Sequence, residues 1–133
     1  MYTIEWEYVE PLIDEKSIAM FENENKVQLP NDIVMCIKKN NGGYPNRNTF
    51  DTQLSKERIF KTLLSFNKGD IEDVFSAVNI LQEDGNSLIP LASDPSGNYI
   101  CYDDKDGIVL WLHETNTIEK IAESFTEFLN KLY

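Results

Sequence analysis

The sequence predicts an α+β fold, a single domain in which an antiparallel β-sheet meander carries flanking helices. Three observations lead to this prediction. Helical patterns dominate the first part of the chain, period-two patterns gather from Leu88 onward, and an amphipathic helical pattern follows at the C-terminus. Helices and strands that cluster separately along a chain are typical of α+β rather than alternating α/β folds. We expect about four helices and roughly five to six strands.

Length and composition support one domain over residues 1–133. A chain of 133 residues buries a core without disulfides or metals, and 41% hydrophobic with 26% charged residues is an ordinary globular balance. The N-terminus lacks the basic and apolar regions of a secretory signal, and no window is long and apolar enough to span a membrane. We therefore expect a cytoplasmic protein.

Two helices are expected before Gly43. The first begins at Pro11 and runs to Asn25, because proline suits the first helical position, where its missing N–H costs nothing. The second begins at Leu29–Asp32, with an acid in its first turn. It ends at Lys38–Lys39, since cations in the last turn followed by Asn40–Gly43 form a stop signal.

The middle of the chain is expected to hold two strands and a third helix. A short strand lies near Thr49–Thr52, and a longer one with imperfect alternation covers Arg58–Phe66. Asp70 is expected to cap the third helix, which fades near Leu81 before the loop 83–86. The apolar stripe of that helix contains Ile71, Val74, Phe75 and Val78.

Four strands and a helix complete the prediction. The strands are expected at Leu88–Ser93, Asn98–Asp103, Ile108–His113 and Thr117–Ala122. Short loops rich in Asp, Asn, Ser, Pro or Gly separate them, which favours antiparallel hairpins. Ser124 and Glu127 have the S-x-x-E spacing of a capping box and predict the start of the last helix.

The charge of the chain bears on its partners. Twenty-three acids against twelve bases give a formal net charge of −11. A nucleic-acid binder normally presents a basic face, and an anionic membrane also repels an acidic protein, so we expect neither contact. A basic protein partner is favoured because complementary fields speed encounter. The alternative, acidity that serves only solubility, stays open.

The segment DPSGNYICYDDKDG resembles a ligand loop but fails each motif. An EF-hand register places Tyr99 where glycine is required or brings Gly107 too early. Glycine-rich phosphate motifs are absent from the sequence, and Gly42–Gly43 ends a helix, where the dipole disfavours anions. We interpret the acids of this segment as turn formers, and we expect no metal and no cofactor.

The sequence evidence for a catalytic site is equally weak. Ser96 lacks the first glycine of a nucleophile elbow. His113, the single histidine, has Glu114 beside it for acid–base work, and a dyad with Cys101 on the neighbouring strand is possible. Cys101 and Cys36 lie among apolar neighbours, so we expect inert thiols, while a disulfide between them stays open. We expect no enzyme, with a hydrolase that uses His113 as a third hypothesis.

Four separated segments together resemble a known family. They are Leu29–Asp32 with the following helix and Asn41–Pro45; Ile89–Asp94 with Gly97–Cys101 and Asp103; Gly107, Trp111 and His113–Glu114; and Ile121–Leu129. In this order and spacing, over roughly residues 29–129, they resemble the SUKH superfamily. That group contains small bacterial immunity proteins related to fungal cell-wall-assembly regulators.

The resemblance implies a compact α+β domain with an antiparallel sheet. Members typically sit beside polymorphic toxin genes and neutralise the cognate toxin, often a nuclease, by binding it. The resemblance carries over neither catalytic residues nor a toxin-contacting surface. We therefore expect a non-enzymatic immunity protein that occludes a basic toxin; the alternative is a regulatory scaffold for an endogenous protein.

Candidate contacts follow from charge and expected exposure in turns. They are Glu83, Asp84, Asp94, Asp103, Asp104, Asp106 and Glu114. The oligomeric state stays open.

Overall fold

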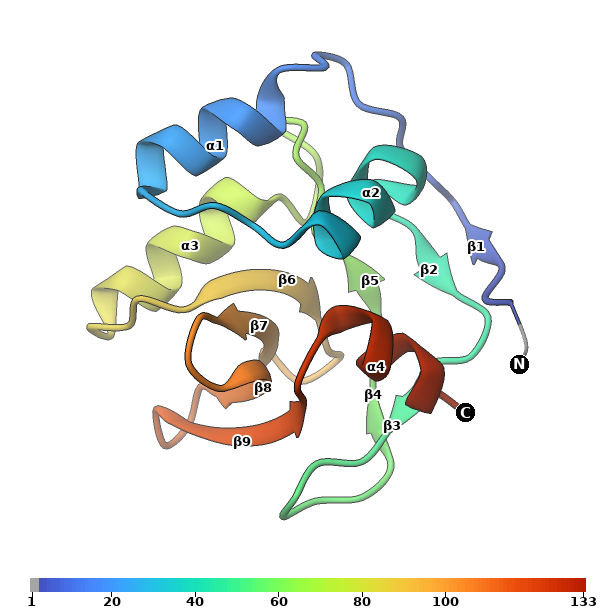
Figure 1. The fold of residues 1–133 in the computed structure, drawn as a ribbon. Coiled ribbons are helices and arrows are strands. Elements are labelled where there is room, and N and C mark those ends of the chain that lie inside the picture. The colour runs from blue at the N-terminus through green and yellow to red at the C-terminus, as the bar shows by residue number, and fades with distance from the viewer. Residues whose placement is uncertain (1–2) are drawn as a thin grey trace.

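A five-stranded antiparallel sheet lies at the centre of the computed structural model, which describes residues 3–133 (Figure 1). Its strand order follows the chain, so the predicted meander and the α+β class are confirmed. Each strand pairs antiparallel with the next one. The strands are β5 (Thr62–Leu63), β6 (Ile89–Ser93), β7 (Tyr99–Asp103), β8 (Gly107–Leu112) and β9 (Thr117–Ala122).

The middle of this sheet is buried on both faces. Ile100 pairs with Leu110, and these two side chains face the main core. Cys101 pairs with Val109 on the opposite face, where a second apolar cluster forms around Trp111. Alternating residues of a strand point to opposite faces, so a strand covered on both sides has an almost continuous apolar sequence, as in GIVLWL of β8.

Four helices flank the sheet in the described part of the chain, as predicted. They are α1 (Ser17–Asn25), α2 (Asn31–Asn40), α3 (Val74–Glu83) and α4 (Phe125–Lys131). The capping box at the start of α4 is confirmed on its serine side, since the Ser124 hydroxyl accepts from the Glu127 N–H at 3.1 Å. Gly42 follows α2 with a φ of 70°, the left-handed conformation that glycine adopts at helix ends.

The first helix begins six residues later than Pro11, at Ser17. The Asn67 side chain holds the intervening segment, because its amide donates to the Pro11 carbonyl at 3.0 Å and its oxygen accepts from the Ile13 N–H at 2.9 Å. The first of these bonds uses the Pro11 carbonyl, which a helix that begins at Pro11 would need for its own hydrogen bonding. Local propensity therefore gives way to a long-range polar contact.

The predicted strand Arg58–Phe66 is wrong as one element. Arg58–Ile59 forms β4 and pairs with β3 (Thr49–Phe50), whereas β5 pairs with β6 in the main sheet. Phe60 lies between the two pairings, fully buried, with its ring stacked on Phe128 at 5.7 Å. The imperfect alternation of this segment reflects a chain that leaves one sheet and enters another.

The start of the third helix is also corrected. Asp73, not Asp70, caps α3, since its carboxylate accepts from the Ser76 N–H at 2.7 Å. Asp70 instead accepts from the Ser65 hydroxyl at 2.6 Å. Ile71, assigned to the buried stripe, is fully exposed at 102%.

The described residues contain nine strands, more than the five to six expected. The additional ones are two-residue segments, among them β1 (Trp6–Glu7), which pairs with β2 (Tyr44–Pro45) beside the main sheet. This pairing brings the N-terminal segment against the turn after α2. No helix among residues 3–133 is long and apolar enough to cross a membrane.

Candidate functional site

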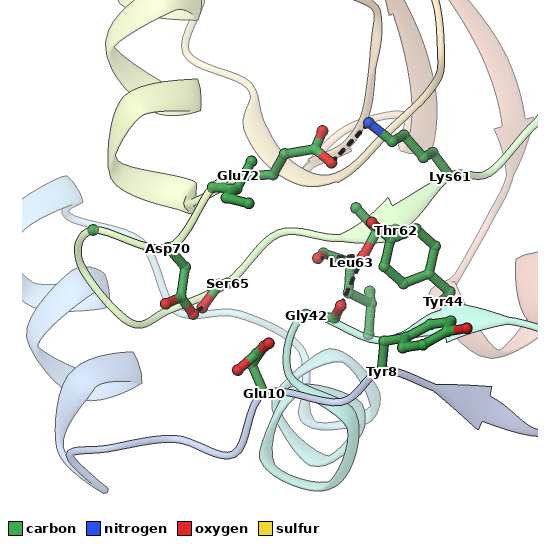
Figure 2. Close-up of a pocket in the computed structure, with 12 residues that line it drawn as sticks. Tyr8, Glu10, Gly42, Tyr44, Lys61, Thr62, Leu63, Ser65, Asp70 and Glu72 are labelled. Atoms are coloured by element: carbon green, nitrogen blue, oxygen red, sulfur yellow. Dashed lines mark hydrogen bonds and ion pairs between the residues drawn. The ribbon is translucent and has the colours of Figure 1, made fainter.

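A groove opens where the N-terminal segment, the turn after α2, strand β5 and the loop before α3 meet (Figure 2). Its volume is about 760 Å³. We name it the tyrosine groove; it is lined by Tyr8, Glu10, Gly42, Tyr44, Lys61, Thr62, Leu63, Ser65, Gly69, Asp70, Ile71 and Glu72. These residues come from segments far apart in the sequence.

The floor of the groove is held by hydrogen bonds from Thr62 and Leu63 to the backbone carbonyls of the turn after α2. The Thr62 hydroxyl donates to the Gly42 carbonyl at 2.8 Å, and the Leu63 N–H donates to the Gly43 carbonyl at 2.9 Å. Gly43 is required here, because a Cβ at this position would lie 2.8 Å from the Asn40 carbonyl oxygen. The turn after α2 and strand β5 are therefore joined as one support.

Tyr8 and Tyr44 form one end of the groove. Their ring centroids lie 5.7 Å apart with the planes at 84°, an edge-to-face contact. Tyr8 has a φ of 56°, a conformation that is unusual for a bulky residue, and its side chain is 76% exposed. The chain on either side is fixed, since Glu7 pairs with Tyr44 and the Glu10 N–H donates to the Asn41 carbonyl at 2.8 Å. These contacts hold Tyr8 on the surface.

The groove is acidic, with three carboxylates among its lining residues against the single ammonium of Lys61. Lys61 is already paired with Glu72 at 3.0 Å, and the hydrogen bond to that carboxylate raises the pKa of the lysine. Asp70 is anchored by Ser65 and Asn67. The Glu10 carboxylate forms no hydrogen bond or ion pair within residues 3–133.

Figure 2 shows the two tyrosines at one end of the groove and Asp70 beside Ser65 at the other, with Glu10 between them. Exposed Ile71 belongs to the same lining. An unpaired carboxylate, exposed aromatic rings and an exposed aliphatic side chain together suit recognition of a polypeptide. The sequence prediction missed this site.

Asp94, one of the predicted contacts, is buried at 7% exposure, so the expectation that it is exposed is wrong. One carboxylate oxygen accepts from the Ser96 and Asn98 N–H groups, both at 2.8 Å, and the other accepts from the Asn98 amide at 2.9 Å. This is the hydrogen-bonding pattern of an Asx-type turn. The carboxylate holds the β6–β7 turn and is not available at the surface.

The remaining predicted acids fall into two groups, and none lines the tyrosine groove. Glu83 and Asp84 end α3 beside the β8–β9 turn that carries Glu114, because the Asn116 amide of that turn donates to the Asp84 carbonyl at 3.1 Å. The second group, Asp103, Asp104 and Asp106, lies in or beside the β7–β8 turn. Successive turns of a meander lie at alternate strand ends, so the structure separates the two groups. All are exposed except Asp103, which is half-buried.

The candidate catalytic pairs do not form. The Cys101 thiol is fully buried and donates to the Tyr99 carbonyl at 3.6 Å, whereas the His113 ring contacts the Ser96 carbonyl at 2.9 Å. Burial raises the pKa of the Cys101 thiol, and burial raises that of Cys36 to about 11. Both thiols are free, which settles the open disulfide. Within residues 3–133 no group of three His, Cys, Asp or Glu side chains is arranged to hold a metal.

Comparison with known proteins identifies the family of the chain. The SUKH_6 family, described as SMI1-KNR4 cell-wall, matches residues 15–129. A relative from Bacillus subtilis (strain 168), the SPbeta prophage-derived uncharacterized protein YokK, is 31% identical over 128 residues, covering 79% of this chain and 67% of the relative. No solved structure matches the chain significantly. The chain therefore belongs to the SUKH family.

Proposed function

We propose that this protein is an immunity protein that binds a cognate bacterial toxin and neutralises it without catalysis. The observation that carries the proposal is the SUKH family match over residues 15–129. The net charge of −11 supports it, because an acidic inhibitor is attracted to a toxin with a basic substrate cleft. A nuclease domain has such a cleft, since it must attract phosphate. The site of action would be the cytoplasm.

Neutralisation would occur by occlusion. An inhibitor seated over the cleft excludes the substrate and needs no chemistry of its own. The exposed turn acids would act mainly on the rate of encounter, because charges at the rim of an interface change association rates more than dissociation rates. Those acids are Glu83, Asp84, Asp104, Asp106 and Glu114, with half-buried Asp103 beside the β7–β8 turn.

The direct experiment is co-expression with each toxin domain encoded beside the gene. We expect one of them to arrest growth when expressed alone, growth to be restored by co-expression, and the two proteins to purify as a complex. If no neighbouring toxin is neutralised or bound, the immunity proposal is wrong.

A salt series tests the electrostatic part. Association with the toxin, measured by stopped-flow fluorescence, should slow as salt rises, since screening weakens long-range attraction. Neutralising the acids of both turn groups to Asn or Gln should flatten that dependence. An unchanged salt dependence in this variant would remove the turn acids from the proposal.

A second candidate function is a regulatory scaffold that binds an endogenous protein. The description of the matched family, SMI1-KNR4 cell-wall, favours it. The two functions differ in genetic context. Deletion of the gene should sensitise the cell to a neighbouring toxin if the protein confers immunity, and should alter growth in the absence of any toxin if it is a scaffold.

A further inference from the structure

We propose that the tyrosine groove is the docking site for the protein partner and that it receives an arginine- or lysine-bearing loop of that partner. The identity of the partner as a toxin rests on the proposed function; the chemistry of the occupant rests on the groove. The acidic turns, which the sequence suggested as the contact surface, lie outside this docking site and would have a secondary role.

The exposed side chains of the groove are the type that anchor interfaces. Tyr8 is 76% exposed and Ile71 102% exposed, and both lie on the same concave surface with half-exposed Tyr44. Tyrosine is enriched among residues that dominate binding energy, especially in or beside pockets. Apolar surface in water is unfavourable, so a partner that covers these side chains gains free energy from their burial.

The charges of the groove select the occupant. The carboxylate of Glu10 is unpaired within the described chain, and the Lys61 ammonium is held by Glu72. A cation entering the groove therefore meets an available carboxylate and two tyrosine rings. Guanidinium groups both pair with carboxylates through a planar fork and stack on aromatic rings, so arginine matches both features.

The walls are arranged before binding, which reduces the cost of ordering on association. The Asn41 side chain donates to the Glu10 carbonyl at 2.8 Å and to the Ser65 hydroxyl at 3.0 Å, and it accepts from the Phe66 N–H at 2.8 Å. This buried amide joins the N-terminal wall, the floor and the far wall. Tyr8 and Glu10 are thus presented by a fixed backbone.

The same charges disfavour other occupants. Nucleic acid and anionic lipid bring phosphates, which the carboxylates repel. A second copy of this chain in a two-fold arrangement would bring the same acidic groove against itself, and like charges across an interface are unfavourable. A basic polypeptide is the occupant that the charges favour.

The test is a titration of ¹⁵N-labelled protein with a tri-arginine peptide at low salt, followed by amide chemical shifts. A tri-glutamate peptide of the same length is the control ligand. We expect saturable shifts at Tyr8, Glu10, Tyr44 and residues 69–72, and none with tri-glutamate. Shifts concentrated in the acidic turns, or no saturable shifts in the groove, would overturn the proposal.

Matched variants make the test residue-specific. Tyr8→Ala and Glu10→Gln should each weaken tri-arginine binding about two- to fivefold, the size expected for an exposed cation–π contact or ion pair. Glu15→Gln removes one exposed charge and Leu54→Ala one exposed apolar side chain outside the groove, and both should bind as the wild type does. Asp70 is left unchanged because its carboxylate is part of the internal network.

The toxin complex then separates this inference from the proposed function. If a toxin binds the wild type and binds the Tyr8→Ala, Glu10→Gln double variant equally tightly, the groove inference is wrong while immunity stands. If tri-arginine binds the groove but no neighbouring toxin is neutralised, the groove inference stands while immunity fails.

Discussion

The Asp94 turn and the tyrosine groove are both acidic loop regions, but they use their carboxylates in opposite ways. Asp94 is buried and accepts three hydrogen bonds from its own turn, whereas the Glu10 carboxylate is exposed and has no partner in residues 3–133. The first carboxylate shapes the chain that carries it. The second is available to another molecule.

The aromatic residues show the same contrast. Tyr99 stacks on buried Trp111 with centroids 6.0 Å apart inside the second apolar cluster. Tyr8 and Tyr44 contact each other on the surface instead. Acidity and aromaticity in a sequence therefore do not identify a site; the availability of those groups in the fold does.

The largest expected effect comes from removing the buried carboxylate. Asp94→Ala should lower the free energy of unfolding by about 3 kcal/mol, because it leaves the buried Asn98 groups without their acceptor and removes bonds to a charged group. Urea unfolding followed by tryptophan fluorescence measures the change.

Glu10→Ala is the matched control for that substitution. It should alter the free energy of unfolding by no more than about 0.5 kcal/mol, since surface substitutions without partners have small effects. Equal losses in the two variants would break the distinction between a structural and an available carboxylate.

Glu119 extends the comparison to a second buried acid. Its carboxylate accepts from the Thr52 hydroxyl at 2.7 Å and the Ser55 hydroxyl at 2.6 Å, which fixes the loop after β3 against β9. Glu119→Ala should lower the free energy of unfolding by about 2 kcal/mol. Thr52→Val, which removes one of the two donors, should cost less, and the reverse order would contradict this account.

The contribution of Glu119 to the free energy of unfolding changes with pH in a definite direction. Burial alone would raise its pKa, but the hydrogen bonds from Ser55 and Thr52 and the nearby Arg58 charge outweigh burial and hold the pKa below its ordinary value of 4.5. A lowered folded-state pKa contributes stability that is complete above 4.5 and is lost as the pH falls through the lowered value. The stability difference between wild type and Glu119→Ala should therefore shrink on acidification, as denaturant unfolding at about pH 7 and about pH 3 would measure. A stability difference that grows on acidification would contradict this account.

The smallest effect on stability is expected at Tyr8. Tyr8→Gly relieves a positive φ but loses the edge-to-face contact with Tyr44, and each contribution is about 1 kcal/mol, so the free energy of unfolding should stay nearly constant. The same substitution should weaken tri-arginine binding. A loss of stability comparable to that of Asp94→Ala would show that Tyr8 serves the fold.

The sequence predicted the scaffold better than the site, for a physical reason. The short apolar strands β7 and β8, the turns that bound them and the Ser124 cap depend on neighbours in the chain, so local patterns identify them. The start of α1 depends on the bond between Asn67 and Pro11, which are 56 residues apart, and the break at Phe60 depends on its packing against Phe128. Local patterns contain neither contact.

The candidate site shows the same division. Its lining residues come from the segments 8–10, 42–44, 61–65 and 69–72, and no motif joins them. Ile71 was assigned to a helix stripe because its spacing to Val74 and Phe75 is helical, yet the cap at Asp73 starts α3 later and leaves this side chain outside. One shift of a helix start converts a core residue into a groove residue.

By itself, the sequence determined the α+β class, the meander, the net charge of −11 and the SUKH resemblance, because each is a property of residue order or composition. Tertiary structure alone decided which acids are available. The Asp94 carboxylate is buried and hydrogen-bonded within its own turn, so it is not available. The pairing of β1 with β2 places Tyr8 and Glu10 beside β5, at the surface of the groove. Availability is a property of contacts between distant segments, and those contacts form only when the chain is folded.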